Sequence, residues 1–436
     1  MAPDEKEILT SWKVISAYLG CKTRTGQRWE KELGLPVHRL SDYPRSRVYA
    51  YKHELDEWIK GKIKIEPKNR QKYLYFLIPL AALILIYFIW IMPSSSSQPY
   101  DFKIEGSELV ALDKNHKELW CYDTGHRDLE EEKFYRDHFQ AKRSSEIPGE
   151  LVSLPLIMIQ DIDNDNKKEV MFIPVLTGSR LGSHLFCFSD RGKTKWVFKQ
   201  TREMVFGDKS YSGWDIRGFT VVDLFGDGYP EVVLMSQNKN MFPSRVAVLD
   251  QKGRLLREYW NSGRIHEFTF YDLDEDGQKE ILLGGCNNEY NRGCLVVLEP
   301  DFKSGASPQT GYYKSPTLVQ GVETQYILFP NTETACLAFM RDPVGRIEII
   351  NNKIISAESK SGLYFEFDSN YNLKEIRFAD RYEDLYQKGH KQGLFENEFS
   401  PKVMAELESQ LYPELLYYNG DDWITASVMA KNQKNQ

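Results

Sequence analysis

Three short segments place carboxylates at a spacing that suits a metal ion. DIDNDNKKEV begins at Asp161, DLFGDGYPEV at Asp223 and DLDEDGQKEI at Asp272. Acidic residues recur at positions 1, 3, 5 and 9, and in a tight loop such side chains converge on one point that suits calcium. The predicted ligands are Asp161, Asp163, Asp165 and Glu169 in the first segment, Asp223, Asp227 and Glu231 in the second, and Asp272, Asp274, Asp276 and Glu280 in the third.

The spacing of these segments also bears on two other interpretations. An EF-hand needs Glu at position 12, where the sequence has Phe172, Leu234 and Leu283, so the EF-hand is excluded. The middle segment carries Phe225 at position 3, which weakens its metal site. The remaining alternative, that the Asp side chains only cap their own turns, stays open.

A second group of residues suits nucleic acid. Helical periodicity is expected over residues 12–19 and again over 24–33. In the second helix, Arg24, Gln27, Arg28 and Lys31 fall opposite an apolar stripe, where they can meet phosphates and base edges. A predicted hairpin follows, and its cations extend the basic surface: Arg39, Arg45 and Arg47.

The string SWKVISAYLGCKTRTGQRWEKELGLPVHR, followed by RVYAYKHELDEWI, resembles the MerR-like and excisionase-like winged helix-turn-helix family. The resemblance implies binding to double-stranded DNA. It places Arg24, Thr25, Gln27 and Arg28 in the major groove, and Arg45 and Arg47 in the wing. Gly26 departs from the larger apolar residue that such domains usually carry. The alternative is a small domain of the same fold that docks on protein.

Catalytic motifs are missing from the sequence. It contains no HExxH, GxSxG, P-loop or GxGxxG string, and its 8 His are scattered. We therefore expect no enzyme. Of the 6 Cys, Cys286 and Cys294 could clip a hairpin together if the compartment is oxidising.

Charge is distributed unevenly along the 436 residues. The net charge is −7, which taken alone argues against a nucleic-acid binder. Residues 1–72 hold 16 Lys plus Arg and 10 Asp plus Glu, a net of +6, whereas residues 73–436 hold 40 and 53, a net of −13. The positive charge thus accompanies the predicted DNA-binding segment.

Between these parts lies YLYFLIPLAALILIYFIWIM, residues 73–92, an uncharged run long enough to cross a bilayer as a helix. Lysines precede it, so the N-terminus is expected to be cytoplasmic. A buried core helix is the alternative. The sequence predicts a single-pass protein of a bacterial-type inner (plasma) membrane, with the C-terminal domain extracytoplasmic.

The rest of the chain is expected to be all-β. Alternating hairpins begin at Leu109, Leu185 and Val246, with degenerate copies from Leu295 and Leu363. With the acidic loops, they resemble FG-GAP/VCBS β-propeller repeats, which implies calcium loops and a propeller-like domain of five to seven blades. Three aromatic residues are expected to pack between blades: Trp120, Trp196 and Trp260.

The predicted fold class is therefore multidomain: a small α winged helix-turn-helix, one transmembrane helix and an all-β propeller-like outer domain. The expected divisions are a DNA-binding domain 1–62, a basic juxtamembrane linker 63–72, the transmembrane helix 73–92, a Ser/Pro spacer 93–100, the β-propeller-like repeat domain 101–395, and a C-terminal helix and tail 396–436.

This layout predicts a membrane-anchored one-component transcription regulator. Its expected partners are double-stranded DNA, the membrane, an unknown extracytoplasmic ligand or protein, and a second copy in a homodimer. The alternative is a surface interaction or adhesion protein whose propeller binds a protein or glycan and whose inner domain docks on protein.

Overall fold

The computed structural model describes residues 7–40, 47–62, 98–139, 154–179, 182–239, 241–334, 337 and 341–434. The chain divides into two compact units, Met1–Pro93 and Ser94–Gln436.

In its described residues, the N-terminal unit combines a small sheet with three helices. Its elements are β1 Ile8–Thr10, α1 Trp12–Tyr18, α2 Thr23–Leu33, β2 His38–Arg39, β3 Val48–Tyr51 and α3 Lys52–Lys62. The strands pair antiparallel in the order β1-β3-β2. Its core contains Leu9, Ile15, Leu35, Val48, Ala50 and Leu55.

The predicted fold class is wrong for this unit. A small α winged helix-turn-helix was expected, but the unit is mixed α and β, and strands supply Leu9, Val48 and Ala50 to its core. Strand β1 is three residues long and pairs with β3, about 40 residues away, with Ile8 opposite Tyr51. So short a stretch carries no local sequence pattern that would predict a strand.

The predicted membrane anchor also requires correction. Among the described residues, no helix combines the length and apolarity needed to cross a bilayer, which contradicts a single-pass inner-membrane protein. The predicted span, residues 73–92, lies outside the described residues, as do the linker 63–72 and most of the spacer.

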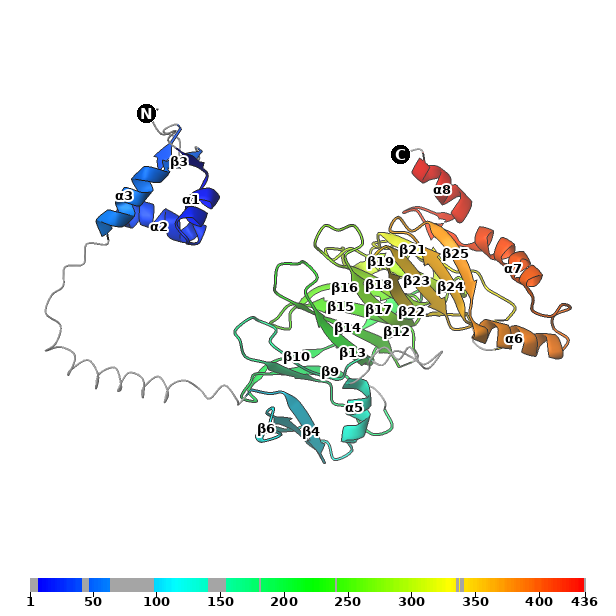
Figure 1. The fold of residues 1–436 in the computed structure, drawn as a ribbon. Helices are drawn as coiled ribbons and strands as arrows, with labels where there is room; N and C mark the ends of the chain where they lie inside the picture. Colours follow the sequence, from blue (N-terminus) through cyan, green and yellow to red (C-terminus); the bar gives the residue numbers. More distant parts are fainter. Residues whose placement is uncertain are drawn as a thin grey trace. The chain divides into compact units, whose positions relative to one another are not determined.

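The C-terminal unit is built from successive sheets whose strands pair antiparallel, except for the parallel pair of β16 and β20 in the third sheet (Figure 1). The first holds β4 Asp101–Glu105, β5 Glu108–Leu112 and β6 Glu118–Asp123; the second β7 Ile157–Gln160, β8 Glu169–Phe172, β9 His184–Phe188 and β10 Thr194–Lys199; the third β13 Trp214–Val222, β14 Glu231–Asn238, β15 Ser244–Leu249, β16 Leu255–Asn261 and β20 Gly305–Ala306.

The fourth sheet holds β17 Ile265–Tyr271, β18 Glu280–Asn287, β19 Arg292–Leu298, β21 Gln325–Leu328, β26 Leu416–Tyr418 and β27 Trp423–Thr425; the fifth holds β22 Val344–Ile350, β23 Ile354–Ser359, β24 Leu363–Phe367 and β25 Leu373–Phe378. A separate hairpin joins β11 Met204–Phe206 and β12 Lys209–Tyr211. The helices are α5 Glu132–Phe139, η1 Gly311–Tyr313, α6 Asp380–Lys391, α7 Pro401–Glu414 and α8 Ala426–Lys434.

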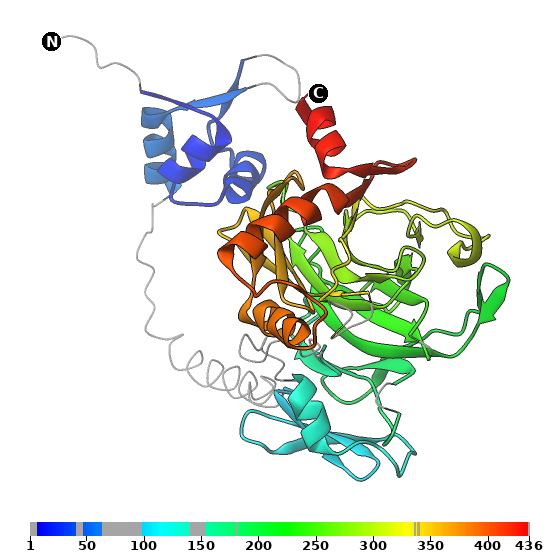
Figure 2. The same cartoon turned by 90° about the vertical axis from the view of Figure 1, so that its right-hand side faces the viewer.

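Consecutive sheets pack face to face. One apolar cluster joins the first three sheets, a second joins the third and fourth, and a third joins the fourth and fifth with α6 and α7. Figure 2 shows these two helices beside the last sheets of the unit. Mainly antiparallel sheets of three to six strands that follow one another in this way make the domain propeller-like.

Repeated contacts bind one sheet to the next. The Trp120 indole Nε1 donates to the Asp190 carbonyl at 2.9 Å, and the Trp196 indole Nε1 donates to the Gln251 carbonyl at 2.9 Å. In each case a glycine of the accepting turn, Gly192 or Gly253, has positive φ, and a Cβ there would overlap the indole. Trp260, also expected between blades, is fully buried.

Two expectations about the hairpins fail. The copy from Leu295 is not a hairpin, because β19 pairs with the distant strand β21. Cys286 and Cys294 are free: Cys286 lies opposite Gly293 and Cys294 opposite Gly285, so their side chains point to opposite faces of the sheet.

Candidate functional site

The three acidic loops occupy equivalent places. The first (residues 161–169) joins β7 to β8, the second (223–231) joins β13 to β14, and the third (272–280) joins β17 to β18. Each therefore connects the first two strands of a sheet. The second and third loops touch, since the Lys279 amide donates to the Leu224 carbonyl at 2.8 Å.

All three loops share one internal hydrogen-bond pattern. The carboxylate at position 1 accepts from the amide at position 6: Asp161 from Asn166, Asp223 from Gly228 and Asp272 from Gly277. The glutamate at position 9 accepts from the amide at position 2, at 3.1 Å for Glu169 and Glu231 and 2.7 Å for Glu280. The acids thus close their own turns, as the turn interpretation requires.

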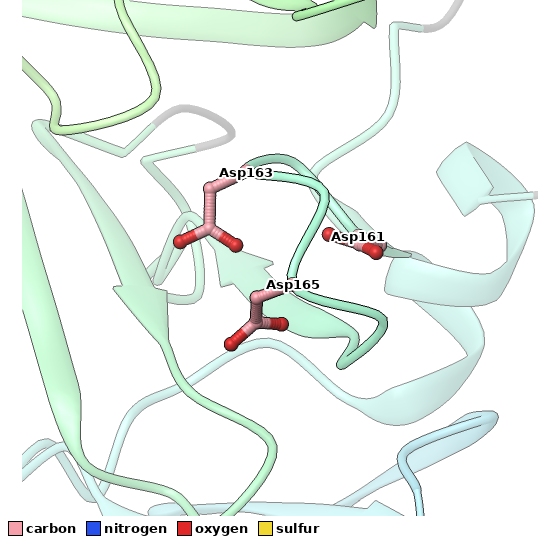
Figure 3. A group of neighbouring side chains, drawn as sticks. All are labelled: Asp161, Asp163 and Asp165. Carbon is pink, nitrogen blue, oxygen red and sulfur yellow. The ribbon is translucent and has the colours of Figure 1, made fainter. Parts of the chain in front are cut away.

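Turn closure leaves carboxylate oxygens available. In the first loop, oxygens of Asp161, Asp163 and Asp165 lie within 4.8 Å of one another (Figure 3), and the corresponding oxygens of Asp272, Asp274 and Asp276 do so in the third. An all-oxygen set of this kind suits a hard divalent cation such as calcium.

The first loop already contains a cation. The Lys195 ammonium on β10 lies 2.6 Å from Asp163 Oδ2 and 2.9 Å from Glu169 Oε1. Burial of the Glu169 side chain raises the pKa of this carboxyl, while the bonded ammonium opposes that rise. Lys167 pairs with Asp165 at 3.3 Å. Lys195 and Lys167 therefore offset part of the negative charge of the first loop.

The third loop has no such compensation among the described residues. No Lys, Arg or His there lies within ion-pair distance of its four acids. Burial, with smaller contributions from Glu299 and Asp274, raises the pKa of Glu280 to about 7. The pKa of Glu299 is itself raised by burial and then by Asp274 and Asp276. Five carboxylates thus gather around the third loop.

The second loop lacks the ligand at position 3. Phe225 stands there, and the Arg257 guanidinium lies 5.4 Å from the centre of its ring. Burial, with smaller contributions from Asp227 and Asp223, raises the pKa of Glu231 to about 7. Of the three loops, the third offers the strongest site for a cation.

The basic face of α2 lies on the surface. Arg24, Gln27, Arg28 and Lys31 are exposed, whereas Thr25 is half-buried. The opposite side packs on α1, where Gly26 is buried and a Cβ in its place would lie 2.9 Å from Ser16 Oγ. The small residue therefore permits close approach of the two helices and leaves the cations outside.

The hairpin cations behave differently. Arg39 forms a two-pronged pair with Glu30 of α2, one arm measuring 3.1 Å, which raises the pKa of the arginine. Arg47 is exposed, and Arg45 lies outside the described residues. Arg39 thus connects the sheet to α2 and offsets the negative charge of Glu30 on that helix.

Sequence reasoning missed Lys195 and Glu299. Both lie far along the chain from the acids they face, in strands or at strand ends with no motif around them. The only available signal was that Lys195 directly precedes Trp196 in a recognised hairpin.

Comparison with known proteins assigns no family. No family model and no curated protein matches the chain. Similar solved structures include a quinohemoprotein alcohol dehydrogenase from Pseudomonas putida HK5 (12% identity, TM-score 0.32, covering 64% of this chain and 40% of that chain). BamB from Moraxella catarrhalis is also similar, with 12% identity and a TM-score of 0.29, covering 65% of this chain and 65% of that chain. The Dos1 propeller has 10% identity and a TM-score of 0.32, covering 63% of this chain and 66% of that chain.

The chain spans less than two thirds of the length of each of these three proteins. At these identities and TM-scores, the propeller-like assignment rests on the sheet topology of the chain itself. The comparisons give no indication of DNA binding, of a helix-turn-helix or of a membrane anchor, contrary to the keywords expected from the sequence.

Proposed function

We propose that the chain is a regulator in which the N-terminal unit binds double-stranded DNA and the propeller-like domain binds the ligand or partner that controls it. The observation that supports DNA binding is the outward basic face of α2. Arginine and glutamine are the side chains that read guanine and adenine edges, and a helix fits the major groove. The proposal assigns the chain no catalytic step.

The arrangement of α2 supports this function beyond its charge. Arg24, Gln27 and Arg28 lie on the exposed side of one helix, and the helix is held to its neighbour through Gly26. Within the described residues, the one ion pair of Arg28 is a long contact to Glu32 at 3.7 Å, with both side chains more than 60% exposed, and such a pair contributes little in water. The guanidinium is thus available to a phosphate or a base.

The test is selection of binding sites from random duplex DNA by the full chain at two salt concentrations. Arg28→Ala is expected to weaken the selected site by about 1–3 kcal/mol if the side chain reads a base. The matched control is Lys60→Ala, which removes an exposed cation from α3. Two half-sites would indicate a homodimer. Recovery of no preferred sequence, or equal losses in both variants, would contradict the proposal.

We further propose calcium as a cofactor of the third acidic loop. Its four carboxylates, with Glu299 beside them, lack a cation among the described residues, and binding calcium would offset their repulsion. Calorimetry of the full chain is expected to give one dominant calcium site. Asp274→Asn should lower the affinity of this site for calcium at least tenfold. The control Asp421→Asn, at an exposed aspartate outside the loop, should leave that affinity unchanged. A silent titration of the unaltered chain would remove calcium from the proposal.

The second candidate function is an interaction protein that works through the propeller-like domain alone. The observation in its favour is the size of this domain, which contributes five sheets as a scaffold. Such scaffolds host many functions, so the fold does not choose between the two candidates. The DNA selection discriminates, since an interaction protein would recover no preferred sequence.

A further inference from the structure

The first strands of three consecutive sheets each carry a β-bulge near their start. The pairing register skips one residue in each strand: Arg217 in β13, His266 in β17 and Gly345 in β22. A bulge re-aims a side chain out of the regular alternation, and bulges recur beside functional sites. Three at the same place in neighbouring sheets form a repeated feature of the domain.

The three bulges are in contact. Arg217 Nη1 donates to the carbonyl of Ile265, directly before His266, at 2.6 Å. Strand β22 packs beside β17, and Lys360 covers its bulge, since a Cβ on Gly345 would lie 3.3 Å from Lys360 Cγ. Side chains from three sheets therefore meet at one place.

This place is rich in positive charge. Burial, with a smaller contribution from Arg264, lowers the pKa of Arg217 to about 9. Burial also lowers the pKa of Lys360, and Arg264 and Arg217 add to this effect. The pKa of His266 falls to about 2 through burial and then through the same three cations. These groups thus repel one another across the interface between sheets.

Several nitrogens at this place have no partner within the described residues. His266 is only 6% exposed, yet its Nδ1 makes no hydrogen bond there. The Nε atoms of Arg264 and Arg341 are likewise buried and without a partner. The nearby carboxylate of Asp342 already accepts the Ser361 amide and hydroxyl. Buried polar nitrogens in folded proteins normally have a hydrogen-bond partner. These three nitrogens therefore point to a bound ligand whose oxygens accept hydrogen bonds from them.

We propose that Arg217, Arg264, His266 and Lys360 bind the phosphoryl group of a small anion, either free phosphate or a phosphomonoester. Two guanidinium groups and an ammonium match a compact dianion with several acceptor oxygens, and arginine favours such oxygens through paired donors. This inference deepens the proposed function by giving the propeller-like domain a ligand class. It does not depend on DNA binding.

The probe is inorganic phosphate, titrated into the full chain by calorimetry in a chloride buffer. Glycerol 3-phosphate is the second arm, with glycerol as its control, and tighter binding of the ester would identify a phosphorylated small molecule as the source. Lys360→Met keeps the stem that covers Gly345 and removes the charge. Lys353→Met, an exposed lysine at the turn between β22 and β23, is the matched control.

Saturable phosphate binding is expected, weakened at least tenfold in Lys360→Met and unchanged in Lys353→Met. The increase in melting temperature that phosphate gives the unaltered chain is expected to be lost in Lys360→Met and kept in Lys353→Met. A purely structural lysine would lower the melting temperature without phosphate but leave that increase in place. No phosphate heat in the unaltered chain, or equal affinity in both variants, would overturn the inference. DNA binding enters neither readout, so the two proposals fail separately.

Discussion

Replacing Lys195 by methionine tests whether its ammonium serves as the built-in cation of the first acidic loop. Methionine keeps most of the stem but removes the charge that lies 2.6 Å from Asp163 and 2.9 Å from Glu169. The two carboxylates, one of them on a side chain only 1% exposed, then face each other without compensation. The folded state should lose stability.

The size of this loss follows from the burial of the partners. Breaking a fully buried ion pair by removing one member costs about 3–5 kcal/mol, whereas an exposed pair contributes about 1 kcal/mol or less. Glu169 is buried but the Lys195 side chain is 26% exposed. We therefore expect an intermediate loss of about 2 kcal/mol in the free energy of unfolding.

The assay is urea unfolding of the full chain, followed by tryptophan fluorescence with a calcium chelator or with excess calcium. Lys193→Met, an exposed lysine of the same hairpin, is the control. Without calcium, Lys195→Met should unfold at lower urea than the control. With calcium the difference should shrink, because the ion takes the place of the ammonium. Any response of the third loop is common to both variants and cancels in the comparison.

Two results would refute the reasoning. If both variants unfold at the same urea concentration, the Lys195 ammonium does not hold the loop. If Lys195→Met is weaker but calcium leaves the difference unchanged, the carboxylates of the first loop act as turn caps and do not take the ion.

Three further predictions concern the packing and the buried groups. Trp196→Phe leaves the Gln251 carbonyl without its indole donor and should lower the free energy of unfolding by about 1–2 kcal/mol in urea titrations. Ser16→Ala removes a buried hydroxyl that has no partner among the described residues, so thermal unfolding should show equal or greater stability, by up to about 1 kcal/mol. His266 stays neutral when folded, since its pKa is lowered to about 2, but takes up a proton below about pH 6.5 when unfolded. Neutral His266 therefore stabilises the folded state at pH 7, and this stabilisation is lost as the pH falls below 6.5, at about 1.4 kcal/mol for each pH unit. In urea titrations at pH 5 to 7, His266→Gln should reduce the dependence of the free energy of unfolding on pH.

The features that sequence predicts well here are those built from neighbouring residues. An acidic loop forms its hydrogen bonds within nine residues, from Asp161 to Glu169, so the spacing of its acids in the sequence is enough to predict its conformation. A hairpin turn does the same, since Asp250 Oδ1 accepts the amides of Lys252 and Arg254, at 2.9 and 2.8 Å. Repetition of these local units was enough to indicate a propeller-like domain.

What sequence did not predict depends on distant partners. The fold class of the N-terminal unit failed because β1 pairs across about 40 residues with β3. The sequence did not distinguish the first metal loop from the third. The structure does, because the Lys195 ammonium bonds to Glu169 of the first loop although the two residues are more than 25 positions apart along the chain. The bulges at Arg217 and His266 are defined by the register between strands, and no residue type in one strand reveals that register.

The two candidate ligand sites of the propeller-like domain lie at opposite ends of the same strands. In β17, His266 stands near the start and Asp272 follows the last residue; the six steps along the strand from one to the other span about 20 Å. Strand β13 repeats this order, with Arg217 near its start and Asp223 after its end. The net charge of −13 after residue 72 therefore conceals a separation of charge, acids at one end of the inner strands and cations at the other. At physiological salt the Debye length is about 8 Å, so charges this far apart are largely screened where solvent reaches them. Calcium and phosphate should consequently bind independently, and coupling between their affinities would require movement of β13 or β17 itself.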